Sequence, residues 1–152
     1  MDSGLTKNRR ITVGGLVGTL VTALVFGLAM IASTVDGRSA GADWAFLAFE
    51  SAILLWTSPA LLLAFTLIGA LHVHLDRGTR ILSALAGLVA VSIYVAILGS
   101  LGLLEFFTLS LFGASVPIWL ALLIAGLAGG AAAHGSWFPG HRLRDHVESQ
   151  DT

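Results

Sequence analysis

Histidine is the residue type whose placement in this chain most suggests chemistry. His72 and His74 end one apolar run, and His134 ends another. Imidazoles on two different helices are suitable ligands for a haem or a divalent metal ion. His72 and His74 are two residues apart, so they do not share a helix face, and both contact one ion only if the helix has ended before them. A histidine at a helix C-terminus also stabilises the helix dipole without any metal. We therefore expect no cofactor and keep a haem or divalent metal site as the alternative.

Glu50 is the one charged residue well inside an apolar run. A carboxylate in hydrocarbon costs a few kcal/mol unless it is neutral, paired or hydrated, so an intramembrane acid is by default a functional hypothesis. Glu105 lies at the same outer level as a possible second carboxylate, and Tyr94 lies at a depth from which it could hydrogen-bond Glu50. Such a group would suit proton relay or cation binding. The alternative is that Glu50 reaches water at the membrane interface.

Small residues at four-residue spacing form the third pattern. Gly14 and Gly18 make one GxxxG motif, and Gly126 and Gly130 make a second. Such ridges let helix backbones approach closely in lipid, where apolar side chains alone do not drive helices together. They predict either packing inside one bundle or a seam between copies of the chain. Because one small bundle has only one interior, we expect part of this surface to serve self-association.

The overall composition indicates a membrane protein. Of the 152 residues, 56% are hydrophobic and 11% are charged, and the mean hydropathy is +0.89. A soluble domain has roughly a quarter of its residues charged. The net charge of -1 excludes a strongly basic nucleic-acid surface, and the absence of cysteine excludes disulfides and thiolate sites. No nucleotide-binding, zinc-protease or serine-hydrolase motif occurs, so we expect no enzyme.

Four apolar runs position these residues. A transmembrane helix needs about 20 apolar residues, and the runs cover about 11–35, 44–71, 81–104 and 106–134. The fold class predicted is all-α, a polytopic membrane protein with four transmembrane helices in an antiparallel bundle. Residues 1–10 form an amino-terminal segment, 11–138 the transmembrane domain and 139–152 a polar tail. The first run exceeds the roughly 7–15 residues of a signal-peptide core, so a helix is favoured over a cleaved leader.

Two prolines interrupt the runs. Pro59 near the middle of the second predicts a hinge, where the hydroxyls of Thr57 and Ser58 could satisfy the carbonyls that proline frees. Pro117 suits either a hinge in one long fourth helix or the first position of a shorter helix. In the second case, residues 101–116 would be an interfacial segment. We favour the long kinked helix, because the run from Pro117 to His134 is short for a span.

The basic residues predict the orientation of the spans. Seven of the eight flank one side, and Arg38 alone lies on the other. The seven are Lys7, Arg9, Arg10, Arg77, Arg80, Arg142 and Arg144. Because Lys and Arg concentrate on the cytoplasmic side of a membrane, both termini are predicted to be cytoplasmic in the cell membrane.

These patterns favour a small non-enzymatic membrane protein, acting as an oligomeric or accessory subunit. Its expected partners are the lipid bilayer and either copies of itself or other membrane subunits, with no nucleic acid. Two alternatives come from other classes of protein. One is a proton- or cation-coupled transporter or channel centred on Glu50, and the other is a haem- or metal-binding anchor that uses His72 and His134.

Overall fold

The computed structural model describes residues 2–36, 43–75, 79–102, 108–111 and 114–138. Within these ranges the chain forms four helices and one short hairpin. The helices are α1 (Asp2–Asp36), α2 (Asp43–His74), α3 (Arg80–Ser100) and α4 (Ile118–Trp137). The hairpin consists of β1 (Thr108–Leu111) and β2 (Ala114–Pro117), paired antiparallel with Leu109 opposite Val116.

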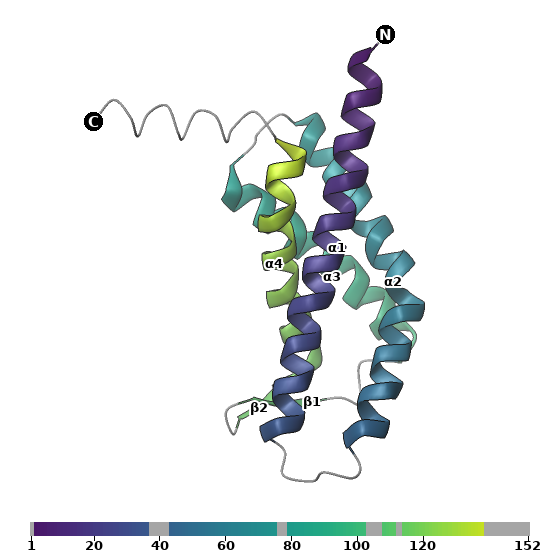
Figure 1. The fold of residues 1–152 in the computed structure, drawn as a ribbon, viewed down its shortest axis with the longest axis vertical. Coiled ribbons are helices and arrows are strands. Elements are labelled where there is room, and N and C mark those ends of the chain that lie inside the picture. Colours follow the sequence, from purple (N-terminus) through teal and green to yellow (C-terminus); the bar gives the residue numbers. More distant parts are fainter. Residues whose placement is uncertain (1, 37–42, 76–78, 103–107, 112–113, 139–152) are drawn as a thin grey trace, which may run out of the picture.

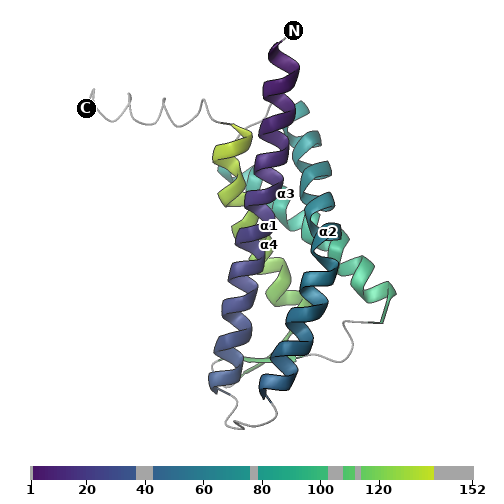
Figure 2. The ribbon, with the colours of Figure 1, turned by 45° about the vertical axis from the view of Figure 1, so that its right-hand side comes forward.

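The helices alternate in direction and form an antiparallel bundle (Figure 1). Each helix packs on two neighbours, in the order α1, α2, α3, α4 and back to α1. The two views in Figures 1 and 2 show α3 lying obliquely to the other three helices. We call the end where α1 begins the basic end, because it carries Lys7, Arg9, Arg10 and Arg80, and we call the opposite end the hairpin end. The start of α1 and the finish of α4 therefore lie at the same end.

All four helices are long and apolar enough to span a membrane, which confirms the predicted fold class. At about 1.5 Å per residue, α3 and α4 are each about 30 Å long and match the hydrocarbon core of a bilayer. The 35 residues of α1 and the 32 of α2 make these helices roughly 50 Å long. In Figure 1 they extend past α3 and α4 at the hairpin end, where β1 packs against α1.

The predicted fourth span, 106–134, is wrong at its start. The structure has the shorter helix, which begins at Ile118 directly after Pro117, and Pro117 is therefore no hinge within a helix. Pro117 has the extended ψ of 137° and ends β2, since proline has no N–H to continue a helix and disfavours helical backbone in the residue before it. Residues of the expected interfacial segment instead form the hairpin, in which Leu109 is buried.

The third helix is also shorter than the predicted 81–104. It begins where Thr79 caps it, with the Thr79 hydroxyl accepting from the Leu82 amide at 3.3 Å. It ends at Ser100, and Gly102 follows with a φ of +70°. Glycine adopts this left-handed backbone without strain, which is why it commonly terminates helices.

Pro59 lies inside α2, and the helix continues through it. A proline leaves the carbonyl four residues earlier without its usual amide donor, and here that carbonyl belongs to Leu55. The Ser58 hydroxyl donates to the Leu55 carbonyl oxygen at 2.7 Å. This bond confirms the role predicted for a hydroxyl beside the proline.

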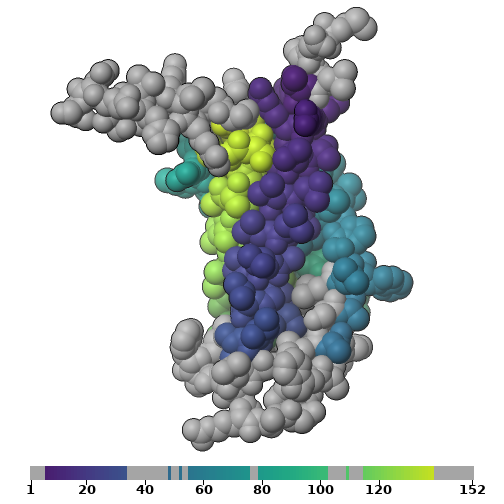
Figure 3. Space-filling model, in the orientation of Figure 1, coloured from purple at the N-terminus to yellow at the C-terminus, as the bar shows by residue number. Residues whose placement is uncertain are grey.

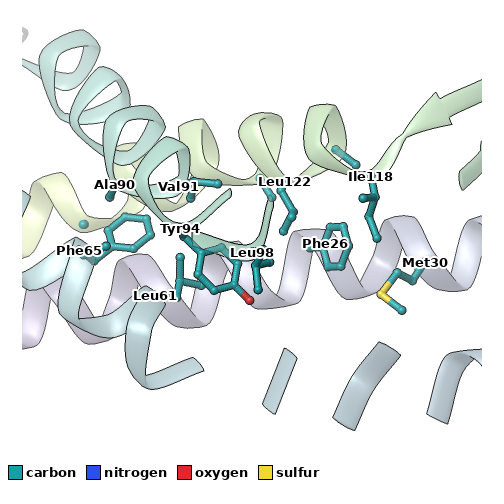
Figure 4. Packing of buried hydrophobic residues seen from close by; sticks show 14 of the residues in the cluster. Phe26, Met30, Leu61, Phe65, Ala90, Val91, Tyr94, Leu98, Ile118 and Leu122 are labelled. Atoms are coloured by element: carbon teal, nitrogen blue, oxygen red, sulfur yellow. The ribbon is translucent and has the colours of Figure 1, made fainter. Parts of the chain in front are cut away.

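The core fills the centre of the bundle with aromatic and aliphatic side chains from all four helices (Figure 4). Phe65 from α2 and Tyr94 from α3 are almost completely buried, and Phe26 from α1 packs with them towards the hairpin end. Val91 and Leu122 close the contact between α3 and α4. The middle of the bundle is therefore a packed apolar layer.

The outer surface is apolar as well. In the space-filling view α1 lies beside α4 (Figure 3). One exposed face of α1 carries leucines at four-residue spacing, namely Leu16, Leu20, Leu24 and Leu28. Trp56 on α2 is 89% exposed. Side chains of this kind on every helix would be costly in water but match lipid, so the burial pattern agrees with the composition of the helices.

Candidate functional site

Three buried polar side chains from three helices meet near the basic end. They are His72 on α2, Ser83 on α3 and His134 on α4, with exposed fractions of 8%, 0% and 9%. His72 and His134 lie in the last turns of their helices, and Ser83 lies in the first turn of α3. The antiparallel packing of α2, α3 and α4 brings these positions to one level. We call this set the His72–Ser83–His134 cluster.

The Ser83 hydroxyl bridges the two imidazoles. Its Oγ lies 3.0 Å from Nε2 of His72 and 2.9 Å from Nδ1 of His134. Both are hydrogen-bonding distances for a nitrogen and an oxygen. A buried polar group is costly unless it is paired, and here each imidazole is paired with Ser83, whose hydroxyl is paired with both. The cluster therefore joins the ends of three helices through polar atoms.

Aromatic rings cover the cluster. His72 makes edge contacts with Trp137 and with Phe138, at centroid distances of 5.7 and 5.1 Å, and His134 lies 5.6 Å from the Phe138 ring. Trp137 and Phe138 are 1% and 8% exposed. They are core residues at the basic end.

Two glycines make room for Trp137. A Cβ added at Gly14 of α1 or at Gly69 of α2 would meet the indole ring directly. The indole thus lies between two helices at the positions where neither has a side chain. Its Nε1 has no hydrogen-bond partner among the described residues.

The second GxxxG motif brings α3 and α4 into backbone contact. A Cβ at Gly87 of α3 would lie 2.6 Å from the N and Cα atoms of Gly130, and it would also meet the carbonyl oxygen of Gly126. A Cβ at Gly126 would lie 2.6 Å from the Val91 side chain. We call the Gly87, Gly126 and Gly130 contact the α3–α4 seam.

The four glycines of the predicted ridges all pack within this chain. Gly14 and Gly18 face Trp137 and Phe65, and Gly126 and Gly130 face α3. One bundle interior therefore accommodates both glycine ridges. The premise that part of this glycine surface is left over for self-association is wrong. Self-association itself stays a prediction, and it requires a surface other than these glycines.

The structure separates His74 from the other two histidines. His74 is exposed, and its Nδ1 accepts a hydrogen bond from the Lys7 ammonium on α1 at 3.1 Å. No group of three or more metal-ligating side chains occurs among the described residues. A bis-histidine haem also requires its macrocycle between the two imidazoles, and here the Ser83 hydroxyl lies between them within 3.0 Å of both. The arrangement fits a hydrogen-bonded pair and does not fit a haem.

Tyr94 pairs with a hydroxyl of α2, and its expected partner Glu50 has a side chain outside the described part of the structure. The Tyr94 hydroxyl lies 2.5 Å from Oγ1 of Thr57, so it ties α3 to α2 in the half of the bundle nearer the hairpin end. Two other hydroxyls on α3, those of Ser92 and Ser100, are exposed and bond carbonyls of their own helix. Two threonines of α1 complete the polar groups of the middle layer, with Thr19 bonded to Gly15 and Thr22 to Ala125 across the contact with α4.

The position of Glu50 along α2 can be compared with the thickness of a bilayer. Glu50 lies within α2, 24 residues before His74, although its side chain is outside the described part of the structure. This spacing corresponds to about 36 Å along a straight helix, whereas the hydrocarbon core is about 30 Å thick. If His74 marks the basic edge of the bilayer, Glu50 lies at or beyond the opposite edge. Glu105, its expected counterpart, is outside the described residues.

Sequence reasoning missed the residues that make the site specific. Ser83 was one serine among several on its helix, and Gly69 and Gly87 belong to no GxxxG motif. A usable signal existed for Ser83, because a serine three residues into α3 lies at the same level as His72 in the last turn of α2. Nothing in the sequence indicated that Trp137 turns inward.

By length and composition of its helices, the chain belongs to the class of multi-pass α-helical membrane proteins. No protein-family model, no curated protein and no solved structure matches it. The functional argument therefore rests on the residues and contacts described above.

Proposed function

We propose that this chain is a small non-enzymatic protein of the cell membrane that acts as an accessory subunit, binding other membrane subunits or copies of itself through its lateral surface. The observation that carries this proposal is the filled middle layer of the bundle. Between the Tyr94–Thr57 pair and the His72–Ser83–His134 cluster, the described interior residues are apolar or are threonines bonded to backbone carbonyls.

This layer argues against a carrier centred on Glu50. A proton or cation that entered near Glu50 would have to pass Phe65, Val91 and the α3–α4 seam, where backbone atoms are in contact. Permeation requires polar groups or water along the path, because an ion in hydrocarbon is costly. The geometry therefore supports a binding surface on the outside of the bundle better than a path through it.

Photo-crosslinking in native membranes tests the proposal. A photoreactive amino acid is placed at Leu24, Leu67, Ile93 or Ile124, which are exposed apolar positions on the four helices, and at buried Phe65 as the control. An accessory subunit should give a discrete protein adduct from one helix or two adjacent helices and lipid adducts from the others. The control position should give adducts within the chain only.

The rival transporter predicts a different result. Purified protein in proteoliposomes should then carry a proton or cation current that Glu50→Gln abolishes, and no helix should give a discrete protein adduct. That combination would overturn the accessory-subunit proposal.

We also propose that the basic end is cytoplasmic, since seven of eight basic residues flank that side of the spans. Reporter fusions at Gly78 and Thr152 should read cytoplasmic, and fusions at Ser39 and after Glu105 should read external. An external reading at Thr152 would contradict this orientation.

A further inference from the structure

The His72–Ser83–His134 cluster constrains where hydrogens can lie. A hydroxyl has one hydrogen to donate, so Ser83 can donate to only one of the two nitrogens and must accept from the other. In the neutral cluster, exactly one of the two facing nitrogens therefore carries a hydrogen. If Nε2 of His72 is protonated, Nδ1 of His134 is bare, and in the reverse arrangement Nδ1 of His134 is protonated and Nε2 of His72 is bare. The tautomers of the two histidines are coupled through Ser83.

The same rule limits how many protons the cluster can hold. One extra proton makes one imidazole an imidazolium, whose N–H donates to Oγ while the Ser83 hydrogen still bonds the other ring. A second extra proton puts an N–H on both facing nitrogens, so the Ser83 hydrogen no longer has a nitrogen to bond. It also places two positive rings with facing nitrogens at most about 5.9 Å apart at a buried site.

We propose that His72, Ser83 and His134 form a proton-binding clasp that joins α2, α3 and α4 at the basic end, remains closed with at most one extra proton, and opens when both imidazoles are protonated. The chemical ligand of the site is the proton. Opening removes the polar link between α3 and its neighbours α2 and α4 at the basic end, because that link consists of the two hydrogen bonds of Ser83. The basic end of the bundle then responds to the pH on its side of the membrane.

The other ionisable groups that the structure describes at this end lie on α1, α2 and α3. On α1 they are Lys7, Arg9 and Arg10, of which Lys7 bonds His74 of α2. Arg80 begins α3 and is exposed. On α4 the described residues include no ionisable group besides His134, and Asp76, Arg77 and residues 139–152 lie outside the described ranges.

The expected pH dependence follows from proton counting. The closed clasp accepts one extra proton and the open form accepts two, so the open form binds one more. The closed form is therefore favoured at higher pH and is lost as the pH falls, with the open-to-closed ratio rising up to tenfold for each pH unit. A cluster of independent histidines without this constraint would show no such coupled opening.

Nitrogen NMR of the wild-type protein tests the hydrogen arrangement without any substitution. In protein labelled with ¹⁵N-histidine at about pH 8, the two buried imidazoles should show complementary states, one facing nitrogen with a hydrogen and the other without. Ser83→Ala should uncouple them, whereas Ser92→Ala on the same helix should not, because Ser92 bonds only its own helix backbone. Hydrogens on both facing nitrogens at about pH 8 would overturn the proposal.

Trp137 reports whether the clasp opens. Its indole contacts His72, and replacing Trp44, Trp56 and Trp119 by Phe leaves it as the single emitter. Between about pH 8 and pH 5, on either side of the ordinary imidazole pKa of about 6.5, its emission should shift to longer wavelength as the clasp opens, because opening exposes the ring to water. The wavelength is the readout and the intensity is not, since an imidazolium at His72 quenches the adjacent indole whether the clasp is open or closed.

Substitutions by glutamine distinguish the clasp from other titrating groups. His134→Gln keeps a hydrogen-bonding side chain but cannot take up a proton, so the clasp holds at most one extra proton and the wavelength transition of Trp137 should disappear. His74→Gln is the matched control, since His74 is an exposed histidine of the same helix end, and it should leave the transition in place. A transition that persists in His134→Gln, or one that disappears in His74→Gln, would show that the clasp is not what opens.

Discussion

Adding a single methyl group at Gly87 tests how the α3–α4 seam supports the site. In Gly87→Ala the new Cβ would lie 2.6 Å from the backbone N and Cα of Gly130, whereas ordinary van der Waals contacts are 3.4–4 Å. The obstacle is backbone and cannot rotate away as a side chain could. The shortest contact is 2.2 Å, to the backbone oxygen of Gly126, so the two helices must separate by at least about 1.2 Å at this point.

This separation has two costs. Overpacking of a closely packed contact costs about 1–3 kcal/mol. In addition, Ser83 lies one turn before Gly87 on α3, and His134 lies one turn after Gly130 on α4. A separation of this size there would lengthen the Ser83–His134 bond from 2.9 Å to about 4.1 Å. At that length it no longer counts as a hydrogen bond, and a lost bond costs about 1 kcal/mol. We expect a total loss of about 2–4 kcal/mol.

Gly27→Ala is the matched control. Gly27 is also within a spanning helix, but a Cβ there meets nothing within 4 Å. It should gain up to about 1 kcal/mol from the better helix propensity of alanine. Unfolding of both variants in detergent micelles, followed by circular dichroism, measures the difference. Equal stability of the two variants, or an unchanged ¹⁵N signal of His134 in Gly87→Ala, would refute the reasoning.

Three further predictions follow from burial and pairing. Tyr94→Phe removes one interhelical hydrogen bond and should cost about 1 kcal/mol in the same unfolding assay, and no loss would mean that the bond contributes nothing. Phe65→Ala should cost about 3–5 kcal/mol of unfolding free energy because the ring is fully buried. Trp56→Ala, at an 89% exposed position, should change it by less than about 0.5 kcal/mol, and similar costs for the two variants would contradict the packing. The double variant Ser83→Ala, Gly87→Ala should lose about 1 kcal/mol less stability than the two single variants added together, since both changes break the Ser83–His134 bond. Strict additivity would mean that the α3–α4 seam does not affect this bond.

The sequence was sufficient for the number and type of the helices, because a run of about 20 apolar residues is a strong signal. It was insufficient at the fourth helix, because the uncharged run of 28 residues from 106 to 133 contains both strand and helix. Hydropathy is nearly the same for a buried strand and a helix, and Pro117 is compatible with both geometries. The hairpin forms because α1 extends beyond α4 and offers β1 a surface, and that length difference is visible only once the helices are assembled.

The site was predictable in its histidines but not in its arrangement. Two histidines at the same ends of parallel-running helices could be placed at one level from the topology alone. The direction in which each histidine points depends on the rotation of its helix about its own axis. That rotation is set by the packing at Gly87 and Gly130 and around the Trp137 indole, and no local sequence pattern fixes it. For the same reason His72 points inward to Ser83 while His74, two residues later, points outward to Lys7.

The difference in length between the long helices α1 and α2 and the short helices α3 and α4 also changes the membrane depth assigned to the polar residues. Counted from the start of its apolar run, Glu50 is about two turns inside the membrane. If α3 and α4, which match the hydrocarbon thickness, set the depth scale, the first turns of α2 lie outside the hydrocarbon core. Among the described buried side chains, the ionisable ones are the two histidines at the basic end and Tyr94. Proton chemistry inside this protein is therefore expected at the His72–Ser83–His134 cluster and not at the carboxylate that the sequence makes most conspicuous.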